Sequence, residues 1–307
     1  MDLKTKLGNI ELQNPLIAAS GTFGYGFEIK DIINIEELGA VTTKTITLHP
    51  RLGNPLPRIL ETPAGLLNSI GLQNPGLKAF KKNIILPWEK IKNVKMFVSV
   101  GGNDISEYIQ VIAELDQYSR IDAFELNISC PNVKKGCLAI GSNPILIEQL
   151  ITQAKSQTKK PIIVKISPNF SNIIETAKIT ETAGADILSM VNTFLGTKID
   201  IKTKDFYFKN KVAGLSGPAI KPLALKLLVD VAEQVKLPII GMGGISNTED
   251  VLEFLIAGAS AVSIGTMNFR NPKILLALAN EMKKQDINVN EIIGSLFNRK
   301  KNKTLIL

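Results

Sequence analysis

Short apolar runs alternate with amphipathic segments along most of the chain. Each run has the length and the polar or glycine flanks of a buried strand. The runs lie at Pro15–Ser20, Ala40–Ile46, Lys95–Val100, Ala123–Cys130, Pro161–Ser167, Ile187–Thr193, Leu237–Gly244 and Ala261–Thr266. Helical patterns lie between most of them, most clearly at Ser106–Tyr118, Ile173–Ala183, Pro222–Val235 and Asn247–Ala257. Eight such units predict an α/β fold, a (β/α)8 TIM barrel in which residues 1–307 form a single domain.

Two of the predicted helices have identifiable starts. Ser106 is the expected N-cap of the first helix, because serine accepts hydrogen bonds from the first turn of a helix. Asn247 is the expected start of the last, because the acidic residues Glu249 and Asp250 follow it and favour a helix N-terminus.

Two segments fall outside this alternation. Lys4–Gln13 contains the pair Gly8-Asn9, which is typical of a hairpin turn, and we expect the hairpin to cross the bottom of the barrel. Thr47–Asn93 is too long for a simple loop and is rich in glycine, proline and asparagine. It predicts a cap inserted after the second strand, over the face that carries the chemistry.

The predicted strands end in polar residues or glycine. In a TIM barrel the carboxyl ends of the strands carry the active site. The ends here are Ala19–Gly21, Lys44–Thr45, Ser99, Asn127–Cys130, Lys165, Asn192–Thr193, Gly243–Gly244 and Gly265–Thr266. Because all eight ends share the pattern, we expect a polar site at this end of the barrel.

The last two strand ends are candidates for a phosphate site. Loops after the seventh and eighth strands commonly bind phosphate in this fold. Gly243, Gly244 and Gly265 would let backbone N–H groups approach the oxygens, and Thr266 adds a hydroxyl. The alternative is that these glycines only permit tight turns; fold precedent favours phosphate.

Two lysines and one cysteine are candidates for catalysis. Lys44 and Lys165 end strands, and an inward lysine needs an anionic partner. A surface lysine is the alternative for each, and a Schiff-base role is a further alternative for Lys165. Cys130 ends a strand and opens a polar loop, which favours reactivity over an inert buried thiol. Cys137 lies further along that loop and receives no role.

Composition and charge narrow the function classes. Hydrophobic residues make up 45% and charged residues 21% of the chain, so a packed core is expected. The net charge is +8, but the one dense basic cluster, Arg299–Lys303, is interpreted as a solvated tail, and no nucleic-acid motif is present. No apolar run has the length of a membrane span or of a signal sequence, so we expect a cytoplasmic protein. Two cysteines and one histidine match no metal pattern.

Six motifs together are similar to those of a known enzyme family. They are Lys44–Thr47, Arg51–Pro55, Asn68–Gly76, Asn127–Asn132, Gly214–Pro222 and Gly241–Gly244. In this order they resemble the class 1 dihydroorotate dehydrogenases over almost the whole chain. Cysteine at position 130 is the class 1 signature, because class 2 enzymes have serine there. The segments 68–76 and 215–222 resemble the NAD-linked 1B branch.

The resemblance implies an activity and a set of cofactors. The enzyme would oxidise (S)-dihydroorotate to orotate in pyrimidine biosynthesis, with hydride passing to FMN N5 and a proton to Cys130. A homodimer of this chain would associate with a partner subunit that carries FAD and a [2Fe–2S] cluster, giving a heterotetramer that reduces NAD. The segment Pro131–Ser142 would close over the substrate.

The resemblance also implies binding residues. Those for the substrate are Lys44, Asn68, Ser69, Ile70, Gly71, Leu72, Asn127, Asn132, Asn192 and Thr193. Those for FMN are Ser20, Gly21, Lys44, Thr45, Ser99, Asn127, Lys165, Val191, Gly217, Gly243, Gly244, Gly265 and Thr266. Ser99 departs from the family pattern, which has asparagine at this place.

Three alternatives remain open. A 1A enzyme would perform the same reaction with fumarate as oxidant and without a partner. A Schiff-base aldolase would use Lys165 and contain no flavin. A non-catalytic flavin-binding scaffold is disfavoured, because the base and the substrate asparagines are both present.

Overall fold

The eight predicted strands pair in parallel and close into a barrel. The computed structural model describes residues 3–129 and 140–298. The strand order is β10-β15-β16-β3-β4-β7-β8-β9, with β9 returning to β10. The strands are β3 (Leu16–Ala18), β4 (Ala40–Thr42), β7 (Lys95–Val100), β8 (Ala123–Asn127), β9 (Ile162–Lys165), β10 (Ile187–Met190), β15 (Ile239–Met242) and β16 (Ala261–Ile264). The predicted TIM barrel is confirmed.

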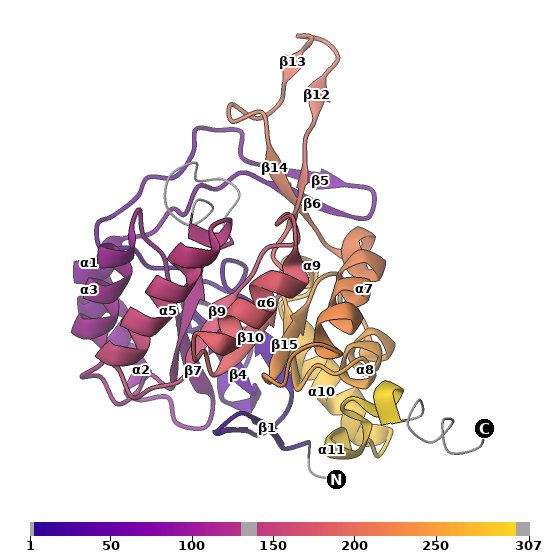
Figure 1. The fold of residues 1–307 in the computed structure, drawn as a ribbon. Coiled ribbons are helices and arrows are strands. Elements are labelled where there is room, and N and C mark those ends of the chain that lie inside the picture. The colour runs from indigo at the N-terminus through magenta and orange to yellow at the C-terminus, as the bar shows by residue number, and fades with distance from the viewer. Residues whose placement is uncertain (1–2, 130–139, 299–307) are drawn as a thin grey trace.

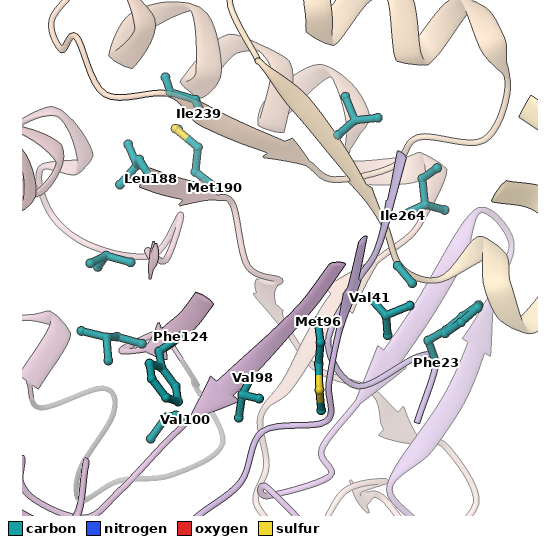
Figure 2. Packing of buried hydrophobic residues seen from close by; sticks show 14 of the residues in the cluster. Phe23, Val41, Met96, Val98, Val100, Phe124, Leu188, Met190, Ile239 and Ile264 are labelled. Carbon is teal, nitrogen blue, oxygen red and sulfur yellow. The ribbon is translucent and has the colours of Figure 1, made fainter. Parts of the chain in front are cut away.

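Alternation along each strand separates two hydrophobic environments. On β7, the side chains of Met96, Val98 and Val100 belong to the large cluster between barrel and helices (Figure 2). Phe97, between them, belongs to a second cluster inside the barrel. Because successive side chains of a strand point to opposite faces, every second residue faces the barrel axis.

Helices surround the barrel on its outer side (Figure 1). The α-helices are α1 (Gly76–Phe80), α2 (Leu86–Trp88), α3 (Ile105–Leu115), α5 (Pro144–Gln157), α6 (Ile173–Thr182), α7 (Lys221–Ala232), α8 (Thr248–Ile256), α9 (Met267–Arg270), α10 (Ile274–Lys284) and α11 (Val289–Ile292). A π-helical turn, η3 (Lys81–Ile85), joins α1 to α2, and η1 (Phe27–Ile29), η2 (Ile35–Glu37) and η4 (Pro218–Ile220) are 3-10 turns. Within residues 3–129 and 140–298, none of the helices is both long enough and apolar enough to cross a membrane.

The helix starts confirm one predicted cap and correct the other. The Asn247 side chain accepts a 2.8 Å hydrogen bond from the backbone N–H of Asp250 and caps α8, as predicted. The predicted N-cap Ser106 is wrong. Asp104 caps α3 instead, by accepting a hydrogen bond from the backbone N–H of Glu107, and Ser106 donates its hydroxyl to the Asp104 carboxylate. A carboxylate at the positive end of a helix is the stronger acceptor.

The predicted N-terminal hairpin closes the lower end of the barrel. Its strands are β1 (Thr5–Leu7) and β2 (Ile10–Leu12), joined by a turn at Gly8. Leu7, Ile10 and Leu12 pack in the same cluster as the inward barrel residues. The barrel interior is therefore filled from this end.

The predicted cap is confirmed in part. Of the stretch Thr47–Asn93, β5 (Ile59–Thr62) and β6 (Gly65–Asn68) lie over the upper end of the barrel, whereas the residues from Gly76 onward form the helix on the barrel's side. A second excursion, which the sequence did not predict, supplies β11 (Phe194–Gly196) and β14 (Ala213–Ser216), so that the roof is a four-stranded sheet, β11-β14-β6-β5. Between them, the hairpin β12 (Ile199–Asp200) and β13 (Asp205–Phe206) projects away from the barrel (Figure 1).

Candidate active site

A cavity lies between the carboxyl ends of the barrel strands and the roof sheet. It contains about 1250 Å³ of empty space, counting its open mouth. All of the predicted site residues that the structure describes line it, except Ser69 and Ser99. Those that line it are Ser20, Gly21, Lys44, Thr45, Asn68, Ile70, Gly71, Leu72, Asn127, Lys165, Val191, Asn192, Thr193, Gly217, Gly243, Gly244, Gly265 and Thr266. Strand ends that are far apart in the sequence therefore form one site.

Asparagine amides on one wall are held in fixed orientations by a serine. The Ser129 hydroxyl donates to Asn127 Oδ1 at 3.0 Å, and Asn192 Nδ2 lies 2.7 Å from Ser129 Oγ. Asn127 Nδ2 donates to Thr45 Oγ1 at 3.1 Å, and Asn192 Oδ1 accepts from the backbone N–H of Thr193 at 2.8 Å. An amide offers donors and acceptors, and this wall can bind a planar ligand that carries both.

Asn68 faces the same cavity from the roof. It ends β6, and its Nδ2 donates to the backbone carbonyl of Gly214 on the neighbouring strand β14 at 3.3 Å. The amide is thus tied to the sheet that covers the cavity. Amides from the floor and from the roof line one volume, and a ligand between them can be bound on more than one edge.

Glycines shape the part of the cavity that was predicted to bind phosphate. Gly243 and Gly244 adopt φ of 129° and 81°, a conformation that side chains disfavour. A Cβ on Gly243 would lie 2.6 Å from Ala224 Cβ, and one on Gly244 would lie 2.7 Å from the backbone nitrogen of Lys221. The close approach at these two glycines is to α7, so the positive φ and the packing against α7 both require glycine here, and both residues also line the cavity.

Gly265 and Thr266 have a different environment. A Cβ on Gly265 would make only ordinary contacts, the nearest at 3.7 Å, so packing does not demand glycine there. The Thr266 hydroxyl donates to Ser216 Oγ at 2.8 Å and joins the end of β16 to the roof. Since Gly265 also lines the cavity, its missing side chain leaves space for a ligand.

An ion pair behind the cavity holds the loop after β15. The buried carboxylate of Asp250 accepts hydrogen bonds from Lys221 Nζ at 2.7 Å, from the backbone N–H of Ser246 at 2.8 Å and from its hydroxyl at 2.7 Å. Burial alone would raise the pKa of Asp250, but the bonds from Lys221 and Ser246 outweigh it and hold the pKa below its ordinary value. Hydrogen bonds to Asp250 and Glu253 raise the pKa of Lys221.

Two lysines reach the cavity from opposite sides of the floor. Lys44 follows β4, and Lys165 ends β9 with an exposed fraction of 6%. Lys165 forms no hydrogen bond or ion pair with another described residue. An ammonium buried in this way favours an anionic ligand, because desolvation is costly without a counter-charge.

Two predicted residues that the structure describes, Ser69 and Ser99, do not line the cavity, and two further predicted residues lie outside the described part of the chain. Ser99 is fully buried below it and its hydroxyl bonds Thr45 Oγ1 at 3.0 Å. Ser69 is buried in the roof and donates to the carbonyl of Val212 at 3.2 Å. Cys130 and Asn132 lie outside the described residues, as does most of the segment Pro131–Ser142.

The sequence missed several lining residues. They are Ala19, Thr22, Ile59, Leu66, Ser216, Ile220, Met242, Ile245, Ser263, Met267 and Phe269. Alternation could have identified Met242 and Ser263, which lie two residues before the inward positions Gly244 and Gly265. No sequence signal marks Ile59 and Leu66, because the roof strands have no clear periodicity.

Comparisons with known proteins agree with one another. The dihydroorotate dehydrogenase family model matches residues 2–285. A Thermoanaerobacter pseudethanolicus protein is 46% identical over 96% of this chain and 99% of its own length, and a Bacillus pumilus protein is 47% identical over 91% and 90%. Both are named dihydroorotate dehydrogenase B (NAD(+)), catalytic subunit. The structure of Eimeria tenella dihydroorotate dehydrogenase with ferulenol superposes with a TM-score of 0.80 at 22% identity, covering 97% of this chain and 89% of that one, which shows the common fold.

The Asp250 ion pair generates a prediction about stability and pH. Asp250→Asn should lower the free energy of unfolding at pH 7 by about 1.5–3 kcal/mol, as expected for lost hydrogen bonds to a charged group. Because the pKa of Asp250 is depressed in the folded state, its contribution is present above the ordinary pKa and is lost as the pH falls through the depressed value. The difference between variant and wild type should therefore shrink below about pH 4. Urea unfolding at several pH values measures it.

Glu253→Gln is the matched control. Glu253 also contacts Lys221, but its side chain is 47% exposed, so the loss should stay under about 1 kcal/mol. An Asp250→Asn loss that is the same at pH 3 and pH 7 would contradict the electrostatic account.

Proposed function

The chain belongs to the dihydroorotate dehydrogenase family, and from this premise we propose that it is the catalytic subunit of an NAD-linked enzyme that oxidises (S)-dihydroorotate to orotate in pyrimidine biosynthesis. The observation that carries the proposal is one cavity that joins asparagine amides, a buried lysine without a described partner and a glycine-lined end. The names of the relatives support NAD(+) as oxidant.

The residues present fit FMN, on which the family depends. We assign its phosphate to the backbone around Gly243, Gly244, Gly265 and Thr266, where Gly265 leaves space. The ring would lie against Lys165 and the residues that end or follow β3, β4, β8, β10 and β14. These are Ser20, Gly21, Lys44, Thr45, Asn127, Val191 and Gly217, which line the same volume. When bound, FMN supplies the hydride acceptor, and Lys165 would stabilise the negative charge that comes with the electron pair.

The substrate would be held by the amide groups. Asn68, Asn127, Asn192 and Thr193 offer the donors and acceptors that the edges of a pyrimidine ring require. Lys44 would bind the substrate carboxylate. The backbone of 69–72, between β6 and α1, would border the ring, and Asn132 is proposed to contribute from outside the described residues. The roof sheet, whose strands cover this end of the barrel, would limit the access of water to the bound substrate.

Cys130 is the proposed base. Dihydroorotate loses two hydrogens from adjacent carbons: one leaves with its electron pair to the hydride acceptor, the other leaves as a proton to Cys130 Sγ, and a carbon–carbon double bond forms. Cys130 lies outside the described residues. Its neighbour Ser129 is fully buried and joined to Asn127 and Asn192, which supports a place for the thiol at the substrate wall. A well-placed thiol near pKa 8.5 can act as a base at neutral pH.

A partner subunit would take the electrons. The chain has only two cysteines, whereas a [2Fe–2S] cluster generally takes four, mostly cysteine, ligands, so FAD and the cluster are assigned to the partner. We propose that residues 1–307 act as one FMN-binding domain in the cytoplasm. Two copies would form a homodimer, and two partner subunits would complete a heterotetramer. Family membership disfavours the Schiff-base aldolase, and the 1A alternative is decided by the oxidant.

Filling the space at Gly265 tests the cofactor site. Gly265→Val should fold, because its Cβ makes ordinary contacts, and it should lower FMN affinity by at least an order of magnitude, about 1.4 kcal/mol. Gly265→Ala should fall between valine and wild type. Titration of the cofactor-free chain with FMN, followed by flavin fluorescence, measures the affinity. Full affinity in the valine variant would place the phosphate elsewhere.

Replacing Cys130 tests the base. Cys130→Ala should slow reduction of bound FMN by dihydroorotate by about 10²–10⁴-fold, because a positioned base contributes that much. Cys130→Ser should retain activity mainly at high pH, since a hydroxyl is harder to deprotonate. Stopped-flow absorbance measures both rates. A near-normal rate in the alanine variant at pH 7 would contradict the assignment, provided that FMN remains bound.

The identity of the oxidant distinguishes the NAD-linked 1B branch from the fumarate-linked 1A branch. The isolated chain should let dihydroorotate reduce its FMN once, and steady turnover with NAD should begin only when the FAD and iron–sulfur subunit is added. Absorbance of NADH measures turnover. Rapid turnover of the isolated chain with fumarate, unchanged by the partner, would instead place the protein in the 1A branch.

A further inference from the structure

The barrel strands bury two charged side chains of opposite sign. Glu125 on β8 is 2% exposed and Lys165 on β9 is 6% exposed. Among the described residues, the other buried charged side chain is Asp250, which lies on α8 and is paired with Lys221. Glu125 has no role in the proposed mechanism. A carboxyl group inside a barrel is costly to bury and calls for a physical reason.

Both side chains face the barrel axis. On β8, Phe124 and Leu126 pack outward against the helices, whereas Ala123 belongs to the interior cluster. Glu125, two residues after Ala123, shares its inward face. On β9, Ile163 belongs to the same interior cluster, and Lys165 shares the face of Ile163.

The strand register places Glu125 one layer below Lys165. Lys165 is the register partner of Asn127, so Glu125 lies two residues earlier on the adjacent strand. With strands about 4.8 Å apart and a rise of about 3.3 Å per residue, the two Cα atoms are roughly 8 Å apart. Side chains of this length are long enough for their charged ends to approach across this diagonal, although the two do not form an ion pair. Lys165 lines the cavity and Glu125 lies beneath it.

Neither group has its interactions satisfied within the described residues. Glu125 Oε1 is buried without a hydrogen bond, and Lys165 forms neither hydrogen bond nor ion pair there. Ser189, the register partner of Lys165 on β10, also has a buried hydroxyl without a partner. A carboxyl group, an ammonium group and a hydroxyl group thus lie on neighbouring strands of the same low-dielectric interior, where charges act on one another strongly even without contact.

We propose that Glu125 is a positioning residue, the buried counter-charge of Lys165, which limits how strongly that lysine stabilises the electron pair held by bound FMN. This inference rests on the proposed function. Without a counter-charge, Lys165 would favour the reduced cofactor more strongly, and the cofactor would be slower to release electrons to a weak oxidant such as NAD. Glu125 thereby lowers the reduction potential of the site.

The reduction potential of bound FMN tests the proposal. Glu125→Gln keeps the shape of the side chain and removes its charge, so the full chain should bind reduced FMN more tightly, relative to oxidised FMN, by at least tenfold. For a two-electron couple this raises the midpoint potential by about 30 mV. Dye-equilibrated spectroscopic titration of the FMN-loaded chain measures it. Lys165→Met should shift the potential in the opposite direction.

Asp122→Asn is the matched control. Asp122 immediately precedes β8, and its carboxylate is paired with Lys95 and Arg120 at the opposite end of the strand. Its removal should leave the potential unchanged. A Glu125→Gln potential equal to that of the wild type would overturn the proposal while leaving the dehydrogenase assignment intact.

The cofactor-free chain gives an independent readout. If Glu125 and Lys165 balance each other, either single substitution leaves an isolated buried charge. The double variant Glu125→Gln/Lys165→Met should then be more stable than the sum of the two single losses allows. Urea unfolding of the four proteins measures this coupling, even where a single variant is too unstable to load FMN. Strictly additive losses would overturn the pairing.

Discussion

Burial of every barrel strand on both faces is the constraint on which the rest of the molecule depends. Outward side chains pack against helices and inward ones fill the axis, so the polar groups that line the cavity lie mainly at the strand ends. The lower end is filled by Leu7, Ile10 and Leu12 of the hairpin. The polar inward positions are therefore displaced toward the opposite end, where Asn127 and Lys165 border the cavity. The polar site lies at the upper end of the barrel because the hairpin fills the lower end with apolar side chains.

The roof completes what the barrel cannot supply. Strand ends provide a polar floor, but a floor open to water would weaken every charge and hydrogen bond in it. The sheet β11-β14-β6-β5 covers this floor and brings Asn68 to the same cavity that Asn127 lines from the floor. The Thr266 hydroxyl bonds Ser216 and so ties the roof to the barrel. The proposed substrate contacts and the proposed cofactor contacts thereby depend on the same connection between roof and barrel.

The sequence predicted the barrel well because buried parallel strands give continuous apolar runs, and these set both the strands and their ends. It predicted the lining residues at the strand ends for the same reason, whereas Asn68, Ile70, Gly71, Leu72 and Gly217 were expected by resemblance. It placed Ser99 at the cofactor by resemblance, whereas the hydroxyl is bonded to Thr45 one layer below. It missed the excursion 194–216, whose strands have two to four residues. They are held by the pairing of β14 with β6, of β11 with β14 and of β12 with β13 rather than by local pattern. The sequence correctly predicted a polar N-cap for α3. Residue preferences alone, however, did not show that Asp104 rather than Ser106 would cap the helix.

Pairing across long sequence separations also sets the order of events during synthesis. The barrel closes through β16 against β3, with Val262 opposite Leu16, and the roof joins β6 to β14. The roof therefore cannot form until the chain has been synthesised as far as Ser216, and the barrel cannot close until synthesis has passed Ile264. Until then, the inward charges and the edges of the first strands are exposed to water and to other chains. A nascent chain truncated before β16 lacks part of the cavity wall. We therefore expect flavin to bind only after β16 has been synthesised and has paired.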